Sequence, residues 1–334
     1  MSKPTDFSML LSSYLTEYLP SLRNVSKNTI SSYCDTFRLL LIYCRDNCSI
    51  KVEKLTIASF SPALIKSFIK WLETERCCST PTKNQRLSNI RAFFKYVQAE
   101  HPSEILICQK IIQIPFAKHE KPKIKYFSVN EMRKILEQPN ISTAFGRRDL
   151  CLLSLMYDTG ARVSEIISIR VRDVCLNAPS KVTLFGKGRK IREVPILTNT
   201  TKLLENYLEE TRLNTHDKLE RPLFTNRQGN SLTRAGVSYI LKKYCDFAEI
   251  KSNCTPHVLR HTKAMHLLEA GVNIFYIKGF LGHEEISTTE VYAKANIEMQ
   301  RSALEKHSVN LSPAVPSWAK NSDTLEWLKN LGKA

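Results

Sequence analysis

A basic stretch broken by two prolines divides the chain into parts that must fold around separate cores. Residues 113–127 read QIPFAKHEKPKIKYF, with several lysines and neither helical nor strand periodicity. Proline removes a backbone donor and restricts the residue before it, so a helix or central strand does not continue through such a stretch. At 334 residues the chain is long enough for two domains. We predict an N-terminal domain over 1–115, a linker over 116–127, a second domain over 128–304 and a tail over 305–334.

The charge balance of the chain indicates a polyanionic partner. Lysine and arginine number 49 against 32 aspartate and glutamate, a formal net charge of +17. Such an excess is typical of proteins that bind nucleic acid or an acidic membrane. No apolar run approaches the ~18–20 residues of a membrane span, and the N-terminus MSKPTDFSML lacks the apolar core of a signal peptide. We therefore expect a soluble, cytoplasmic protein that does not enter a membrane.

The ten cysteines are scattered and form no paired Cys-x-x-Cys sets. That spacing argues against a zinc site and against a disulfide framework. Half of the cysteines sit among apolar residues, which favours their use as small core residues in a reduced cytosolic chain. These are Cys34, Cys44, Cys108, Cys151 and Cys245. We predict neither a disulfide nor a metal site.

Only helical patterns occur in the first 115 residues. Ser26 is a suitable N-cap for a segment whose apolar residues fall on one face, and Ser61-Pro62 and Thr80-Pro81 open two more. The helix that opens at Thr80 has an apolar stripe made of Leu87, Ile90, Phe94 and Val97.

A second stripe on that helix is polar and also follows helical spacing. Amide, hydroxyl and guanidinium groups along one face can reach the phosphates and base edges of a duplex, whereas the plain alternative is a solvated surface. The charge balance favours the first interpretation. We predict DNA contacts from Asn84, Ser88, Arg91 and Lys95, and from Lys121 and Lys123 in the basic linker.

The second domain mixes helices with a small sheet. Ser128 and Glu131 form a capping box at its start, and a buried helix ends at Gly160. The stretch KVTLFGKGRKIREVPI (181–196) alternates on both sides of Gly186-Lys187-Gly188, which predicts a β-hairpin with a lysine at its tip. Further helices are predicted over 199–211, 233–248, 256–270 and 273–282. The expected fold class is mainly α with a small β-sheet (α+β).

The stretch TPHVLRHTK (255–263) begins one of these helices. Thr255 is a good N-cap and Pro256 suits the first helical position, so His257, Arg260 and His261 fall in the first two turns. A helix N-terminus already favours negative charge, and cationic side chains there add to the effect. An anion is the expected ligand.

Five further polar residues stand at structurally marked positions. Any one of them alone has an ordinary structural explanation. They are Arg162 after the helix-ending DTGA, Glu165 one turn later, Lys187 at the hairpin tip, His283 at the end of FLGH and Tyr292 in STTEVYAKA.

Together these positions resemble the catalytic domain of the tyrosine recombinases, also called phage integrases, and are most like Xer-type members. The resemblance is carried by DTGARVSEIISIRVRDV, TPHVLRHTKAMHLLEAGVNIFYIKGFLGH and STTEVYAKA. The H-x-x-R pair, the L-G-H triplet and the tyrosine nine residues after that histidine are jointly specific. The N-terminal half resembles the family's helical core-binding domain in pattern only. Ala161 and Gly279 depart from the common pattern, at positions that affect local packing.

The resemblance implies a DNA transesterification. Tyr292 attacks the scissile phosphate and forms a 3′-phosphotyrosine, leaving a free 5′-hydroxyl. Arg162 and Arg260 bind the non-bridging oxygens, for which planar guanidinium groups are well suited. Lys187 protonates the leaving 5′ oxygen.

The remaining residues support that chemistry. The resemblance implies that His257 assists proton transfer, His283 hydrogen-bonds the phosphate, and Glu165 orients the arginine and histidine groups; His261 is structural. No cofactor is implied, because the phosphotyrosine bond conserves the energy of the cleaved phosphodiester. The expected partners are double-stranded DNA and further copies of the chain, as a dimer on one site and a tetramer on two, with an accessory DNA-bending protein or partner recombinase as a further option.

The tail is predicted to contact a neighbouring protomer. Pro313 and Pro316 make its first part extended, and a short helix carrying Leu325, Trp327 and Leu328 follows. So short a helix is marginal alone and needs docking. Insertion into an adjacent subunit is our prediction, and docking within the same chain is the alternative.

Other functions fit the sequence less well. HVLRH places two histidines at zinc-site spacing, but a metalloprotease has glutamate where Val258 stands, and GKGRK is too short for a P-loop. A catalytically silent DNA-binding protein would not need the complete set of catalytic residue types, and a type IB topoisomerase usually lacks the L-G-H…Tyr arrangement. We predict a site-specific recombinase that integrates, excises or transposes a mobile element, with Xer-type dimer resolution as the alternative.

Overall fold

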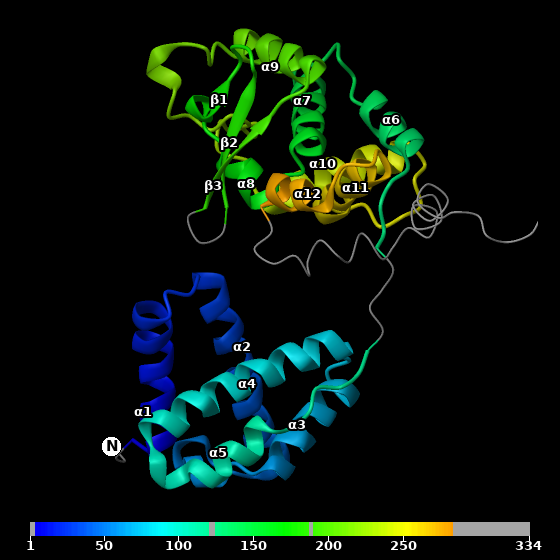
Figure 1. The fold of residues 1–334 in the computed structure, drawn as a ribbon. Coiled ribbons are helices and arrows are strands. Elements are labelled where there is room, and N and C mark those ends of the chain that lie inside the picture. The colour runs from blue at the N-terminus through cyan, green and yellow to red at the C-terminus, as the bar shows by residue number, and fades with distance from the viewer. Residues whose placement is uncertain (1–3, 120–123, 187–189, 283–334) are drawn as a thin grey trace, which may run out of the picture. The chain divides into compact units, whose positions relative to one another are not determined.

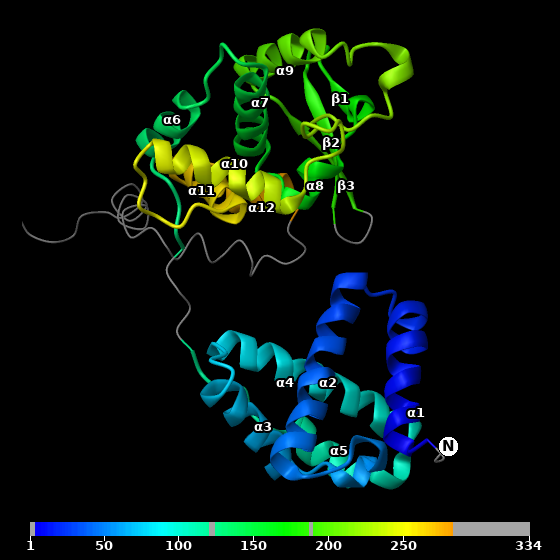
Figure 2. The same cartoon turned by 180° about the vertical axis from the view of Figure 1, so that it is seen from behind.

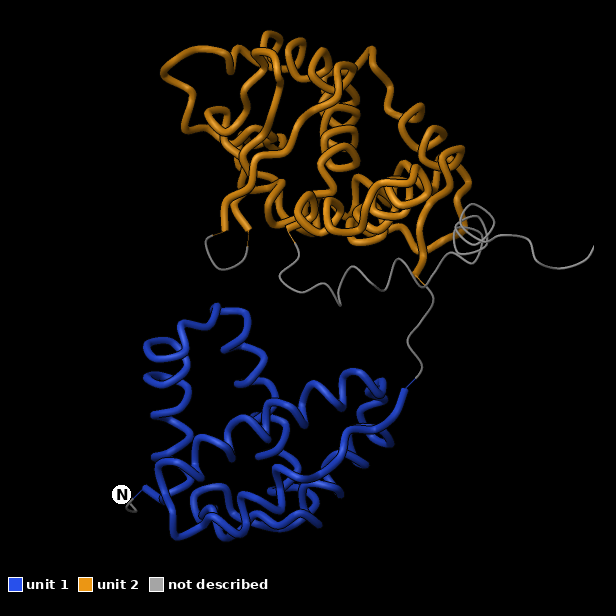
Figure 3. Tube along the Cα trace, in the orientation of Figure 1, with its two compact units in different colours: residues 1–122 blue, residues 123–334 orange. Residues whose placement is uncertain are grey.

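The computed structural model describes residues 4–119, 124–186 and 190–282. The chain forms two compact units, Met1–Pro122 and Lys123–Ala334 (Figures 1 and 3). The boundary between them falls within the proline-containing basic stretch. Each unit has its own cluster of buried apolar side chains.

In the described residues 4–119 of the first unit, all regular secondary structure is helical, as predicted. Ser26 caps the second helix by accepting a hydrogen bond from the Thr29 N–H, and Ser61 caps the third in the same way from Leu64. Its longer helices are α1 (Asp6–Ser13), the π-helix η1 (Tyr14–Leu22), α2 (Lys27–Cys48), α3 (Pro62–Thr74), α4 (Thr80–Glu100) and α5 (Ile105–Ile112). Three 3-10 turns join them: η2 (Val52–Lys54), η3 (Ile57–Ser59) and η4 (Pro102–Glu104).

Aromatic rings fill the core of this unit. Phe93 on α4 lies 5.9, 5.3 and 5.0 Å, between ring centroids, from Phe7, Tyr14 and Phe37. Both cartoon views show α4 crossing α2 (Figures 1 and 2). The predicted apolar stripe of α4 is buried, and so are four of the five cysteines assigned to the core. The assignment of Cys34 was wrong: its side chain is exposed, because it lies on the face of α2 that also carries the exposed Ser31 and Arg38.

The described residues of the second unit combine helices with a small sheet, so the predicted fold class is confirmed. The sheet has the order β1-β2-β3 and is antiparallel, with Val182 opposite Val194. The strands are β1 (Val174–Cys175), β2 (Lys181–Phe185) and β3 (Ile191–Pro195); the predicted hairpin is β2 and β3, while β1 was not predicted. The helices are α6 (Val129–Glu137), α7 (Ala144–Thr159), α8 (Val163–Ser168), α9 (Thr198–Glu210), α10 (Arg234–Phe247), α11 (Pro256–Glu269) and α12 (Ile274–Leu281), with 3-10 turns η5 (Val171–Asp173) and η7 (His216–Lys218).

Helix α7 is the central element of this unit. Its side chains from Cys151 to Met156 are all buried, and it packs against both α9 and α11. The predicted capping box at the start of α6 is present: the Ser128 N–H donates to Glu131, and the Glu131 N–H donates to the Ser128 hydroxyl. None of the described helices is long and apolar enough to cross a membrane.

Both ends of the predicted linker are bound to the unit they adjoin. Asn84 on α4 hydrogen-bonds both the N–H and the carbonyl of Ala117. At the other end, Phe127 is fully buried, and its N–H donates to the Thr262 hydroxyl of α11 at 3.0 Å. Tyr126 donates to the Glu269 carboxylate at 2.9 Å. The packed structure therefore extends further into the 116–127 stretch than its composition indicates, because isolated aromatic and small residues there find partners on α4 and α11.

Candidate active site

The turn between α7 and α8 brings Arg162 and Glu165 together. Helix α7 ends at Gly160, whose φ of +54° lies in the left-handed region that favours glycine. A Cβ there would come within 2.7 Å of the Leu281 side chain, so glycine also permits the close approach of α12. Arg162 then caps α8, and its backbone N–H and Nη1 donate to the Glu165 carboxylate at 2.8 and 2.9 Å. The predicted pairing of these two residues is present.

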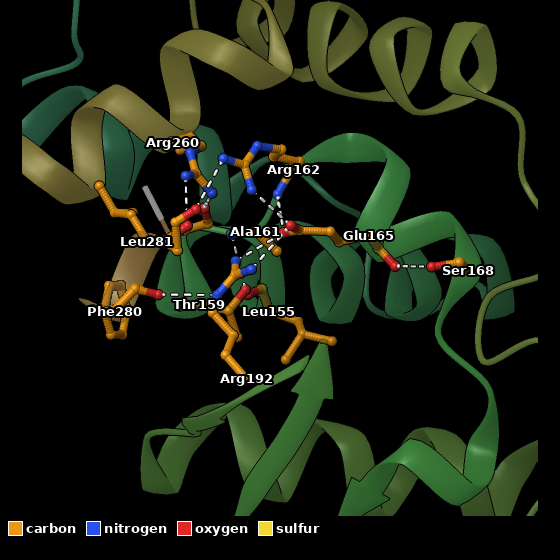
Figure 4. A network of polar contacts seen from close by, with 12 residues as sticks. Leu155, Thr159, Ala161, Arg162, Glu165, Ser168, Arg192, Arg260, Phe280 and Leu281 are labelled. Carbon is orange, nitrogen blue, oxygen red and sulfur yellow. Dashed lines mark hydrogen bonds and ion pairs between the residues drawn. The ribbon is translucent and has the colours of Figure 1, made fainter. Parts of the chain in front are cut away.

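Glu165 is almost completely buried, at 2% exposure, and a second arginine compensates its charge. Arg192 on β3 donates from Nη1 and Nη2 to the two carboxylate oxygens at 2.9 and 2.8 Å (Figure 4). Burial by itself would raise the pKa of Glu165, but the hydrogen bonds from Arg192 and Arg162 outweigh it and hold the pKa below its usual range. The carboxylate is therefore a fixed negative charge between two fixed positive ones.

Sequence reasoning missed Arg192. A signal was present: in the alternating stretch KIREVPI, Arg192 falls two residues before Val194 and therefore on the same face of the strand. Val194 is fully buried, and the Arg192 side chain is only 13% exposed. A charged residue at an inward position of a strand needs a buried partner of opposite sign. The sequence alone does not say which acid provides it.

Arg260 binds the backbone at the ends of two helices. Thr255 caps α11 as predicted, accepting from the Val258 N–H, and this places Arg260 in the buried second turn at 3% exposure. Its Nη1 donates to the Gly160 carbonyl at 2.7 Å and its Nη2 to the Leu281 carbonyl at 2.6 Å. Arg162 adds a bond from Nη2 to the next carbonyl, that of Gly282, at 3.2 Å. The two arginines thus hold the end of α12 beside the turn that follows α7 (Figure 4).

Two histidines flank Arg260 on α11. The rings of His257 and His261 lie 4.1 Å apart between centroids. His257 is exposed at the surface of the cluster, and desolvation of its inner side, together with the charges of Arg260 and Arg162, lowers its pKa. Burial and the neighbouring cations lower the pKa of His261 further, to about 4. Near neutral pH both rings are uncharged, so His257 is able to accept a proton.

The polar stripe of α4 is divided between structural and exposed residues. Asn84 is bonded to Ala117, and the Arg91 guanidinium lies 4.5 Å from the centre of the Phe116 ring. Ser88 and Lys95 point to solvent. The helix therefore uses half of the stripe to hold the chain that leaves the unit.

Comparison with known proteins assigns both units. Residues 125–299 match the phage integrase family, and residues 11–103 match the N-terminal SAM-like domain of phage integrases. The chain belongs to the phage integrase family. Its members, the tyrosine recombinases, cleave and rejoin DNA through a tyrosine intermediate, and the prediction of such an enzyme is confirmed.

Relatives of this recombinase carry both integrase and Xer names. It is 34% identical over 314 residues to a putative integrase/recombinase of Sinorhizobium fredii, covering 92% of this chain and 93% of that protein. It is 32% identical over 294 residues to tyrosine recombinase XerC of Bacillus subtilis, covering 87% and 93%. Solved structures share the fold: XerH bound to a palindromic difH substrate (TM-score 0.70, 20% identity, 88% of this chain and 84% of that one) and the Tn1549 transposon integrase with transposon right end DNA (TM-score 0.69, 17%, 89% and 99%).

The structure brings together four of the seven residues predicted for the recombinase site, namely Arg162, Glu165, His257 and Arg260. The other three, Lys187, His283 and Tyr292, lie outside the described residues, as do Lys121, Lys123 and the tail over 305–334. His283 directly follows Gly282, the last described residue, whose carbonyl accepts a hydrogen bond from Arg162. The described residues contain no group of three or more His, Cys, Asp or Glu side chains arranged to hold a metal ion.

Proposed function

We propose that this recombinase integrates, excises or transposes a mobile element, cutting double-stranded DNA at specific sites through a 3′-phosphotyrosine at Tyr292. The observation that carries the proposed cleavage chemistry is the convergence of Arg162 and Arg260 at the end of α12, with His257 beside these two arginines. Permanent positive charge beside a proton acceptor suits a reaction in which negative charge spreads over a phosphate. The Arg162 side chain, at 36% exposure, is open to such a ligand.

The proposed cleavage step balances without an external cofactor. The Tyr292 oxygen forms a bond to phosphorus while the bond from phosphorus to the 5′ oxygen breaks. His257 takes up the phenolic proton, and Lys187 donates a proton to the leaving oxygen. The guanidinium groups of Arg162 and Arg260 stabilise the non-bridging oxygens. Rejoining is the same exchange in reverse, with a new 5′-hydroxyl as the nucleophile.

Double-stranded DNA is the proposed partner of both units. The net charge of +17 favours a polyanion, and the XerH and Tn1549 integrase structures hold DNA substrates. In the first unit, Ser88 and Lys95 are the exposed members of the α4 stripe and are the contacts we propose there. We further propose a dimer on one DNA site and a tetramer on two, because strand exchange between two duplexes needs four cleavages.

Xer-type resolution of chromosome or plasmid dimers is the second candidate. The observation in its favour is the similarity to XerC proteins over most of both chains, 87% and 93% in the case of B. subtilis. The chemistry of the two candidates is identical, so they differ in the DNA sites that are joined.

A suicide substrate tests the proposed nucleophile. The substrate is duplex DNA from the native locus with a nick close to the cleavage site. After cleavage the short fragment with the new 5′-hydroxyl diffuses away, so the strand cannot be rejoined and the wild-type protein should remain as a covalent adduct. Tyr292→Phe should bind the same DNA with unchanged affinity and form no adduct, because phenylalanine lacks the attacking oxygen. An adduct formed by the Phe variant would assign the nucleophile elsewhere.

Deletion of the gene from its host separates the two biological roles. Loss of circular or newly inserted copies of a flanking element, measured by PCR across its junctions, supports integration and transposition. Accumulation of plasmid or chromosome dimers with the element unaffected would instead establish dimer resolution.

A further inference from the structure

Arg192 bonds to two separate parts of the active site at once. From β3, its Nη1 and Nη2 donate to the two oxygens of Glu165 on α8, and its Nε donates to the Phe280 carbonyl on α12 at 3.1 Å. The end of α12 and the start of α8 are 115 residues apart in sequence, counting from Glu165 to Phe280. One side chain therefore fixes the spacing between them (Figure 4).

Two glycines show how closely this contact is packed. A Cβ at Gly282 would lie 3.0 Å from Arg192 Nη1, and the φ of Gly282, +65°, is itself in the left-handed region. A Cβ at Gly186, the residue directly after β2, would lie 3.4 Å from Glu165 Oε1. The planar guanidinium thus fits between the two chain segments with little space to spare. Lysine, a single point donor on a flexible stem, cannot reproduce this fit.

The contacts of Glu165 extend this effect to Arg162. The carboxylate that receives Arg192 also receives the Nη1 and the backbone N–H of Arg162. The same Arg162 guanidinium reaches the Gly282 carbonyl. If Arg192 were absent, Glu165 would keep one arginine and lose the other, and the end of α12 would lose its bond to the hairpin. The Arg162 guanidinium would then be free to rotate with Glu165 away from the phosphate.

We propose that Arg192 is a positioning residue for cleavage, which locks Glu165 and the end of α12 so that the Arg162 guanidinium meets the scissile phosphate. This inference rests on the proposed function. This role differs from general stabilisation, because Arg192 would affect cleavage through the position of the Arg162 guanidinium. The effect of Arg192 should therefore depend on the negative charge of the phosphate that Arg162 binds. A displacement of about 1 Å in such a group is enough for a loss of about 100-fold in rate.

The experiment compares Arg192→Gln and Arg192→Lys with wild type on two suicide substrates. One carries a normal scissile phosphodiester, and the other carries a methylphosphonate, in which a methyl group replaces one non-bridging oxygen and removes the charge that Arg162 meets. Lys181→Gln is the matched control, since Lys181 forms an exposed ion pair with Glu193 on the same hairpin at 2.8 Å. DNA affinity and thermal unfolding are measured for every variant.

On the phosphodiester, Arg192→Gln should cleave about 100-fold more slowly than wild type at saturating enzyme, with unchanged DNA affinity. Arg192→Lys should be intermediate, and Lys181→Gln should match wild type. On the methylphosphonate, Arg192→Gln should cleave only about a few-fold more slowly than wild type, because this substrate lacks the charged oxygen that Arg162 stabilises. On the phosphodiester, the double variant Arg192→Gln with Arg162→Ala should cleave only slightly more slowly than Arg162→Ala alone.

Equal losses on the two substrates, or full additivity with Arg162→Ala, would overturn the proposal and leave Arg192 a structural residue. Wild-type cleavage by Arg192→Gln would overturn it as well. Should the Gln variant not fold, Arg192→Lys carries the same comparison between substrates. Failure of the proposed function would look different, because Tyr292→Phe would then form an adduct whatever occupies position 192.

Discussion

The two units of this recombinase bury different kinds of side chain. Among the described residues of the first unit, the buried polar or charged side chains are Thr36, Lys83 and Asn89, and the other buried side chains are apolar, with aliphatic and aromatic residues mixed. The described part of the second unit buries five charged side chains: Asp149, Asp158, Glu165, Asp173 and Arg260. Burying a charge costs free energy unless it is paired and hydrogen-bonded. The second unit therefore bears a desolvation cost that the first unit largely avoids.

The partners of the buried charges separate stability from chemistry within the second unit. Asp149 accepts hydrogen bonds from Arg148 and from the Tyr244 hydroxyl. Glu165 and Arg260 instead bond to Arg162 and to the end of α12. In this second set, Arg162 and His257 have exposed atoms that a ligand can reach. Glu165 and Arg260 are therefore the buried charges of the second unit that bond to the predicted site.

The largest effect is expected from Glu165→Gln. The substitution keeps the shape but removes the negative charge, so Arg162 and Arg192 are left facing each other without compensation. The free energy of unfolding of the second unit should fall by about 3–5 kcal/mol, and suicide-substrate cleavage should be lost. Glu193→Gln, in an exposed ion pair with Lys181, should change stability by less than about 1 kcal/mol. Near-normal cleavage by Glu165→Gln would show that the buried charge serves stability alone.

Phe93→Ala should have a comparable effect on stability but in the first unit alone. Its ring contacts Phe7, Tyr14 and Phe37, so truncation leaves a cavity in the aromatic core and should cost about 3–5 kcal/mol. Hydrogen exchange followed by mass spectrometry should show faster exchange in residues 4–119 and unchanged protection of α7 and α11. The control is Leu22→Ala, at a side chain that is 78% exposed. Loss of protection in both units would mean that their cores are not independent.

Lowering the pH is expected to reduce the stability of the folded chain moderately. The folded chain holds the pKa of His261 at about 4, below the ordinary value of 6.5, so the unfolded chain binds a proton between these values and the folded one does not. Stability should therefore fall as the pH drops from 6.5 towards 4. The contribution of His261 between pH 7 and pH 5 is about 1 kcal/mol after allowance for its partial exposure. Urea unfolding at the two pH values measures it, and His261→Gln should flatten the dependence. An unchanged pH dependence in that variant would assign the acid sensitivity to other groups.

The smallest effect separates two residues of the α4 stripe. Asn84→Ala removes both hydrogen bonds to Ala117 and should lower the stability of the first unit by about 1 kcal/mol, because the bonds are partly exposed. Its DNA affinity should not change. Lys95→Gln should leave stability unaltered and reduce the slope of log affinity against log salt by about 1, as expected for a lost phosphate contact. A reversal of the two outcomes would make Asn84 the DNA contact and Lys95 the structural residue.

Much of the local structure could be predicted from the sequence because it depends on near neighbours. Ser26, Ser61, Ser128 and Thr255 cap the helices that their positions indicate, since a cap bonds to an N–H only three residues away. Gly160 ends α7 for an equally local reason, its left-handed backbone. The antiparallel pairing of β2 with β3 follows from the alternation of apolar and polar residues in the sequence on both sides of Gly186. The residues of the site were predicted from a resemblance in motif. The pairing of Arg162 with Glu165 is again local, because the two are three residues apart.

The tertiary structure alone decided the contacts between segments that are distant in the chain. Arg192 finds Glu165, Arg260 finds the carbonyls of Gly160 and Leu281, and Asn84 finds Ala117. Many acids and carbonyls could serve as partners for each of these side chains, and pattern does not choose among them. It also could not show that Cys34 is exposed, because burial depends on which helix covers a face and not on the residues beside it in sequence. The sequence by itself determined the helices, the hairpin and the set of polar groups; packing determined which guanidinium holds which oxygen, because a hydrogen bond needs atoms within about 3 Å and only the folded chain brings them there.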